Sequence, residues 1–166
     1  MNRFRDSIVA LAMAVLTVGV LTATPAAGAA TKYWSGDGTW NATNTNWGTS
    51  QGGPYNVATF NTGDDAVFEG TAGTVTVSSP NNPNSITFTV TGYTLSSGTL
   101  TLNGAGIAVN TGTATIGSVV AGSVGLTKTG SGTLAINGTC TYSGATAING
   151  GTLTLGGGTL VAGAVL

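Results

Sequence analysis

Residues 125–155 read GLTKTGSGTLAINGTCTYSGATAINGGTLTL and carry a single charged side chain, Lys128. Most other positions are Gly, Thr, Leu, Ile, Ala or Asn, which offer almost no group that could donate a proton, bind a phosphate or hold a metal. Apolar and polar residues nevertheless alternate, as in TLAI at 133–136 and TLTL at 152–155. A period of two is typical of a strand with one buried face. The stretch is therefore expected to be ordered β-structure rather than a disordered linker.

The same alternation runs through much of the chain. It recurs in TVTV at 74–77, SITFTV at 85–90, TLTL at 99–102, GIAVN at 106–110 and TATI at 113–116. Gly, Asn or Ser bounds each run, and no window beyond the first thirty residues has a helical period of comparable length. The sequence predicts an all-β protein.

A repeated motif, Gly-Thr-Leu/Ala-x-Leu/Ile, begins at Gly98, Gly112, Gly132 and Gly151, so the last two steps are nearly equal in length and the first is shorter. About 20 residues at ~3.3 Å each trace ~65 Å, which suits one turn of a coil of short strands. We therefore predict a parallel β-helix, a solenoid in which each turn bonds to the turns above and below it. The side chains expected to stack inward are Leu134, Ile136, Leu153 and Leu155. Those expected to face water are Thr133, Thr152 and Thr154.

The first thirty residues have the features of a secretory signal peptide. MNRFR is a basic start, SIVALAMAVLTVGVL is an apolar run, and ATPAAGAA provides an Ala-x-Ala pattern at Ala27 and Ala29. The uncharged stretch 7–21 is shorter than the ~20 residues that cross a bilayer, so no membrane span is expected in the mature chain. We expect the protein to be secreted, into the medium or onto a bacterial surface. Cys140 is the only cysteine, so no internal disulfide can form, and with no His to activate it we interpret the thiol as a bystander.

Charge is scarce, at 5% of residues against roughly 25% in a typical soluble domain. Beyond the first thirty residues there are two positive and four negative side chains, a balance of minus two: Lys32, Lys128, Asp37, Asp64, Asp65 and Glu69. Two isolated lysines cannot supply the counterion release that drives phosphate-backbone binding. Nucleic acid is thus excluded as a partner.

The carboxylates are the candidates for chemistry. Asp64, Asp65 and Glu69 could pair as acid and base in the manner of a glycosidase, but GDDAVFEG reads more simply as a turn that leads into a strand. We predict no catalytic residue, no enzyme activity and no cofactor. Calcium is the open alternative at these three carboxylates, although the chain lacks both the Gly-Gly-x-Gly-x-Asp pattern and the spacing of an EF-hand loop.

An aromatic cluster lies near the start of the mature chain. Tyr33, Trp34, Trp40 and Trp47 fall within fifteen residues, together with Asn41, Asn44 and Asn46. Two interpretations stay open. The rings could cap the first turn of the solenoid, which we favour, or Trp34, Trp40 and Trp47 could stack on sugars in a carbohydrate-binding module.

Residues 125–155 also resemble a known repeat family. GLTKTGSGTL, TYSGAT and INGGTLTL are similar to the autotransporter-associated β-strand repeat, also called the passenger-associated transport repeat. The upstream YWSGDGTWNATNTNW and GDDAVFEGTAGTVTV resemble segments that precede such repeats in secreted bacterial proteins. Cys140 departs from the pattern, where a small or polar residue such as Asn is usual. The resemblance implies a right-handed parallel β-helix, displayed at a bacterial surface as part of a large adhesin-like passenger.

The expected organisation has three parts: a signal peptide at 1–30, an aromatic-rich N-terminal cap with the first turns at 31–72, and β-helix repeats at 73–166 with the clearest repeat at 125–155. The chain ends in GGGTLVAGAVL, in mid-pattern. We therefore expect strands around Leu153 and Leu160 without a polar cap, and either end-to-end self-association or further repeats in a longer passenger. Surface glycans and host or matrix components are the expected partners.

Overall fold

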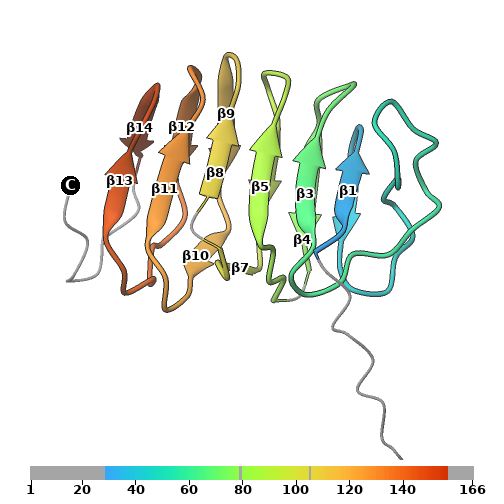
Figure 1. Cartoon of the computed structure of the whole chain (residues 1–166), viewed down its shortest axis with the longest axis horizontal. Helices are drawn as coiled ribbons and strands as arrows, with labels where there is room; N and C mark the ends of the chain where they lie inside the picture. Colours follow the sequence, from blue (N-terminus) through green and yellow to red (C-terminus); the bar gives the residue numbers. More distant parts are fainter. Residues whose placement is uncertain (1–28, 79, 105, 157–166) are drawn as a thin grey trace, which may run out of the picture.

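The computed structural model describes residues 29–78, 80–104 and 106–156, and shows an all-β solenoid of parallel strands (Figure 1). Two sheets hold six strands each. The first sheet comprises β1 (Thr31–Trp34), β3 (Asp65–Phe68), β5 (Ser85–Phe88), β8 (Gly106–Val109), β11 (Leu126–Thr129) and β13 (Thr146–Ile148). The second sheet comprises β2 (Gly38–Trp40), β4 (Thr74–Val77), β6 (Thr94–Ser96), β9 (Thr113–Ile116), β12 (Thr133–Ile136) and β14 (Thr152–Leu155). The predicted parallel β-helix is confirmed.

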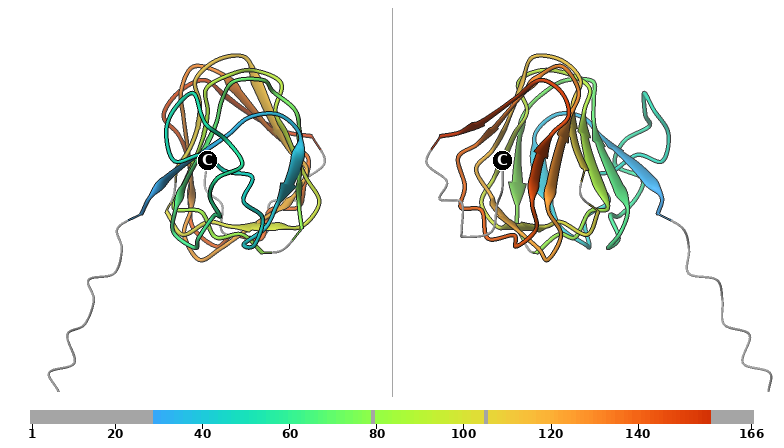
Figure 2. Two further views of the ribbon diagram at one scale, coloured as in Figure 1. Left: turned by 90° about the vertical axis from the view of Figure 1, so that its right-hand side faces the viewer. Right: turned by 60° about the vertical axis from the view of Figure 1, so that its left-hand side comes forward.

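A third, smaller sheet closes the coil. It pairs β7 (Thr99–Thr101) with β10 (Val119–Ala121), and parallel bridges from Asn81 to Leu100 and from Val120 to Cys140 extend it. About four turns thus contribute to all three sides, with partial turns before and after them. Figure 2 shows these coils superimposed when the molecule is seen from its end.

The strand register repeats at nearly the same spacing from turn to turn. Asp65 pairs with Ser85 and Ser85 with Gly106, while Thr133 pairs with both Thr113 and Thr152. The two longer steps of the glycine motif, which end at Gly132 and at Gly151, are therefore true turns. The shorter step is not, because Gly98 precedes β7 in the third sheet whereas Gly112 precedes β9 in the second.

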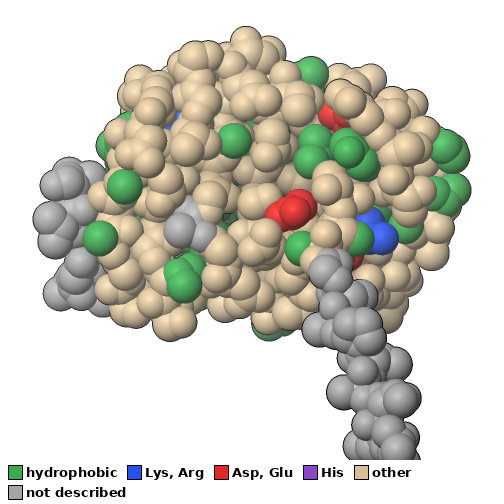
Figure 3. Space-filling model, viewed as in Figure 1, with side chains coloured by type: hydrophobic (Ala, Val, Ile, Leu, Met, Phe, Trp, Pro, Cys, Tyr) green, Lys and Arg blue, Asp and Glu red, His purple; other side chains and the backbone are tan. Residues whose placement is uncertain are grey.

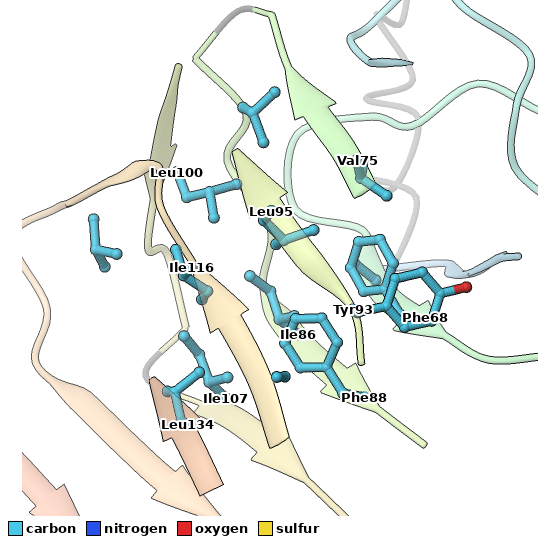
Figure 4. Close-up of a cluster of buried hydrophobic side chains, with 14 of the residues drawn as sticks. Phe68, Val75, Ile86, Phe88, Tyr93, Leu95, Leu100, Ile107, Ile116 and Leu134 are labelled. Atoms are coloured by element: carbon cyan, nitrogen blue, oxygen red, sulfur yellow. The ribbon is translucent and has the colours of Figure 1, made fainter. Parts of the chain in front are cut away.

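The interior consists of ladders of side chains stacked turn upon turn (Figure 4). Leu134 lies in register with Leu153 and Ile136 with Leu155, as predicted. Leu134 and Ile136 are buried, Leu153 is half-buried and Leu155 is 37% exposed in the last described turn. Other ladders include Leu95 with Ile116, Ile86 with Ile107, and Phe68 with Phe88. On the outside, Thr152 and Thr154 are exposed and Thr133 is partly so.

Glycine permits the tight corner between the first and second sheets. Gly130 and Gly151 have φ of 77° and 65°, in the left-handed region that costs glycine little. A Cβ on Gly130 would collide with the Val109 carbonyl of the turn below, and one on Gly151 with the Gly132 carbonyl. Consecutive turns can therefore approach closely at this corner only without side chains.

Between β2 and β3 the chain leaves the coil in a long excursion, residues 41–64, at the end of the solenoid where β1 lies (Figure 1). The excursion folds back along β1 in the antiparallel sense: the Tyr33 N–H donates to the Gly48 carbonyl at 3.1 Å and the Gly48 N–H to the Tyr33 carbonyl at 2.7 Å. Trp47 then bridges to Ala58. The main-chain N–H and C=O of Tyr33 on the outer edge of β1 are thus paired, which hinders the addition of another chain at that point.

Two predictions fall largely outside the described residues. These are the signal peptide, of which residues 1–28 are not described, and the final turn around Leu160.

Candidate functional site

The three tryptophans form one buried cluster beneath the excursion. Trp34 is 1% exposed, and Trp40 and Trp47 are fully buried. The Trp47 ring lies 5.0 Å from that of Trp34 and 5.2 Å from that of Trp40, both in edge-to-face contact. Phe60 and Phe68 complete the set, with the Phe60 ring 4.8 Å from Trp40. Edge-to-face contacts at these distances stabilise aromatic pairs beyond the area that they bury.

This geometry does not provide the sugar-binding surface considered from the sequence. A sugar ring stacks on an exposed aromatic face, and the faces of Trp34, Trp40 and Trp47 are covered by other rings or by the chain. The neighbouring amides also bind main chain: Asn41 Oδ1 accepts the Thr43 and Asn44 N–H groups, and Asn46 Nδ2 donates to the Thr39 carbonyl. Sequence proximity indicated a cluster correctly, but the rings face inward because they fill the first turns of the core.

Each of the four carboxylates of the described residues accepts hydrogen bonds from a different part of the chain. Asp37 Oδ1 accepts the Thr74 N–H at 2.5 Å and so links the first turn to the second. Buried Asp64 accepts the N–H groups of Ala30 and Asn61, at 3.1 and 2.9 Å. Asp64 thereby fixes the entry to β3.

The other two carboxylates act in the same way. Asp65 Oδ1 accepts from Asn84 Nδ2 at 2.8 Å and from Ser85 Oγ at 2.6 Å, which joins β3 to β5. Glu69, 6% exposed, accepts the Gly52 N–H at 2.8 Å and the Tyr55 hydroxyl at 3.0 Å. Glu69 therefore fastens the excursion to the second turn. The pKa of Tyr55 is raised by the burial of its phenol and by Glu69.

Within the described ranges, no three His, Cys, Asp or Glu side chains come together as a metal site would require. Asp64 and Asp65 are consecutive in sequence, but their oxygens bind donors from different turns. Asp64, Asp65 and Glu69, the residues considered for calcium or for acid–base chemistry, thus accept hydrogen bonds from backbone or side-chain donors of neighbouring segments.

Tyr93 is a residue that sequence reasoning missed. It precedes β6 with its side chain buried, and its hydroxyl reaches the corner between the first and second sheets. There it lies 2.7 Å from the Glu69 carbonyl, 2.8 Å from that of Thr71 and 3.3 Å from that of Trp34, and it accepts the Gly36 N–H at 3.2 Å. Burial raises its pKa to about 12. One phenol therefore connects the corners of the first two turns.

Lys128 occupies the equivalent corner of the later turns. Its side chain is fully buried, and Nζ donates to the carbonyls of Thr129, Gly130 and Gly150 at 2.5, 3.0 and 3.1 Å. Burial lowers its pKa, because the ammonium loses its hydration. The alternation L-T-K in GLTK places Lys128 on the same side as buried Leu126, which is the signal that could have revealed it.

Cys140 faces the core of the third side, bridged to Val120 and 1% exposed. Burial raises the pKa of its thiol, which keeps the thiol protonated and poorly nucleophilic. Nearby, the buried Tyr142 and Thr146 hydroxyls share a hydrogen bond of 2.7 Å. The two hydroxyls satisfy each other inside the core, and neither they nor the Cys140 thiol is exposed to solvent.

The outer wall carries little charge. In Figure 3 most of the visible surface is backbone or uncharged polar side chain, with acidic and basic groups at only a few places. Among the described residues no helix has the length and apolar character to cross a membrane.

Comparison with known proteins agrees with this architecture. Residues 126–155 match the family model of the passenger-associated-transport-repeat. The chain is also similar to the protein named Adhesin BmaC autotransporter of Brucella suis biovar 1 (strain 1330), at 44% identity over 122 residues. That match covers 65% of this chain and 4% of the adhesin, so the chain corresponds to a small part of that protein's length. No solved structure matches the chain significantly. The predicted resemblance is confirmed: the chain carries a passenger-associated transport repeat, and this repeat forms β11 to β14 of a parallel β-helix.

Proposed function

We propose that the protein is a structural β-helix module in a secreted or surface-displayed, adhesin-like passenger, and that it performs no catalysis. The observation that carries the proposal is the matched repeat itself: residues 126–155 form one complete turn and the first two strands of the next, and both continue the same sheets as the turns before them. The similarity to an autotransporter adhesin supports the location.

The module would act by lengthening the passenger. Each turn of about 20 residues lengthens a parallel solenoid by one strand spacing, about 4.8 Å. Backbone pairing and a thin apolar core hold the rod, so the wall is free to be uncharged Thr, Asn and Ser. Such a rod holds whatever precedes or follows it away from the cell.

Glycans and matrix components remain the proposed partners, through the polar wall and not through the tryptophan cluster. Thr152 and Thr154 of the last described strand are exposed and provide hydroxyl groups there. The burial of the three indoles argues for a contact that is broad and hydroxyl-rich instead of an aromatic platform.

Surface display can be tested by thiol labelling of intact cells of the producing bacterium. Ser123 is exposed on the wall, whereas the natural Cys140 is buried. The Ser123→Cys variant should react with a membrane-impermeant maleimide on intact cells, and the unaltered chain should not, because its thiol is shielded. Labelling of the variant only after cell lysis would contradict surface display.

A further inference from the structure

The outer face of the second sheet carries a line of threonines that follows the axis of the coil. Strand pairing places one residue from each of β4, β6, β9, β12 and β14 in register, and we call this set the threonine column: Thr74, Thr94, Thr115, Ala135 and Thr154. All five alternate with residues of the core and are exposed or partly exposed. Consecutive members lie about 4.8 Å apart, because each is one strand spacing from the next.

The hydroxyl groups of this column are not used by the protein itself. Elsewhere on the wall hydroxyls bind neighbouring protein groups: Ser85 donates to Asp65 Oδ1, and Thr89 and Ser131 donate to main-chain carbonyls. Among the described residues, no hydroxyl of the threonine column has a hydrogen-bond partner in the protein. The column therefore presents donors and acceptors that are free to bond to a ligand.

The strands that carry the column contain no ionisable side chain. From GTW of β2 to TLTL of β14, the second sheet consists of apolar residues, Gly, Thr and Ser. The first sheet differs, because Asp65, Val67 and Ala108 interrupt the hydroxyls of its outer face. A charged partner would find no opposite charge on the column. The ligand that fits this face is therefore neutral and rich in hydroxyl groups.

We propose that the threonine column binds an extended, neutral, β-linked polysaccharide that lies along the axis of the solenoid. One sugar of such a chain is close in length to one strand spacing, so each turn meets one sugar. The threonine hydroxyl bonds to a sugar hydroxyl, and the threonine methyl contacts the C–H groups of the ring. Each contact is weak, because both partners give up bonds to water, but contacts on successive turns add up along one polymer. This inference rests on the proposed function and deepens it, since it names the class of glycan and the face of the wall.

Ala135 is the gap in the column and permits a test by gain of binding. Ala135→Thr supplies the missing hydroxyl, and a β-branched residue suits an outward position of a strand, so the variant should fold. Its affinity for the polysaccharide should rise by roughly two- to fivefold, the effect of one added hydrogen bond. The matched control is Ala108→Thr, at a partly exposed position on the outer face of the first sheet, which should leave the affinity unchanged.

Binding is measured by co-sedimentation of the purified full chain with suspensions of cellulose, chitin and mannan, three neutral β-linked polysaccharides. The chain should bind at least one of them. The double variant Thr94→Ala, Thr115→Ala should bind that polysaccharide roughly tenfold or more weakly, because it loses two adjacent hydroxyls of the column. Its control is Thr87→Ala with Thr129→Ala, two positions on the outer face of the first sheet on either side of Ala108. The control should bind as the unaltered chain does, and melting curves establish that each variant is folded.

Two results would overturn the proposal. One is a folded chain that sediments with none of the three polysaccharides, whether or not acidic alginate retains it. The other is an equal change of affinity in Ala135→Thr and Ala108→Thr, since the contact would then not lie on the threonine column. Neither result would affect the proposed function, which fails instead if Ser123→Cys is not labelled on intact cells.

Discussion

Leu134 and Thr154 lie on neighbouring strands of the second sheet and face opposite ways. Leu134 is fully buried in the core, whereas Thr154 is exposed on the wall. Leu134→Asp should lower the free energy of unfolding by about 4 kcal/mol or more, because it places an unpaired carboxylate in a thin apolar ladder. Thr154→Asp should change it by less than about 0.5 kcal/mol. Equal losses in denaturant titrations of the two variants would refute the inward and outward assignment.

The buried phenol of Tyr93 should make the stability of the fold decrease at alkaline pH. Burial raises the pKa of its phenol to about 12, above the ordinary 10.0, so the folded state favours the protonated form. The resulting stability is complete below pH 10 and is lost as the pH rises from 10 toward 12. Tyr93→Phe should be less stable at pH 8, by about 1–3 kcal/mol, because the single O–H of the phenol no longer donates to the Glu69 carbonyl, its nearest acceptor at 2.7 Å. The variant should also lose less stability than the unaltered chain between pH 10 and 12. If the free energy of unfolding fell equally with pH in Tyr93→Phe and in the unaltered chain, Tyr93 would not be the group whose titration is coupled to unfolding.

At the scale of elements, the excursion 41–64 and its tryptophans act as a cover on the first turns. Buried indoles emit at short wavelength, so the folded chain should show blue-shifted fluorescence that shifts to the red only on unfolding. Added polysaccharides should leave the emission unchanged. Trp47→Ala should lower the free energy of unfolding by about 3–5 kcal/mol, because it opens a cavity in the core. A saturable change of emission with a polysaccharide, in a chain that remains folded, would restore the sugar-binding interpretation.

The stability of the protein should not depend on calcium, because Asp64 and Asp65 are already engaged in hydrogen bonds. Both carboxylates accept hydrogen bonds from backbone or side-chain donors of separate turns, and Glu69 is engaged with the excursion. Millimolar Ca²⁺ should therefore leave the melting temperature unchanged in both the unaltered chain and the variant Asp64→Asn, Asp65→Asn. An increase in the unaltered chain that the double variant lacks would establish a calcium site, because a ligand of the folded state raises its stability.

For the whole molecule, the sequence pattern predicts the repeating parts and not the exceptions. Alternation in TLAI and TLTL identifies the rungs because period two and a buried face are local properties. The pattern does not show that the Gly98 motif lies on a different side of the coil, since it shares the sequence Gly-Thr-Leu with the motifs at Gly132 and Gly151. Where the excursion 41–64 folds back on β1, only long-range contacts decide the outcome.

The interior polar groups escaped prediction for a different reason. Lys128 and Tyr93 satisfy main-chain carbonyls at corners, and the need for such partners is visible only once the path of neighbouring turns is known. The buried tryptophans are a similar case: composition predicts an aromatic cluster, but solvent exposure depends on what covers it. Composition and period thus specify the coil, while its closures and corners depend on contacts between turns.

Nuclear Overhauser contacts across β9, β12 and β14 test the parallel solenoid most directly. In-register parallel stacking predicts backbone proton contacts between Thr133 and both Thr113 and Thr152, and between Leu134 and Leu153. It predicts no antiparallel contacts between consecutive strands such as β11 and β12, which belong to different sheets. Parallel contacts between these residues, each one full turn from its partner, would establish the coil. An antiparallel ladder between residues 126–129 and 133–136 would instead show a hairpin and contradict the account.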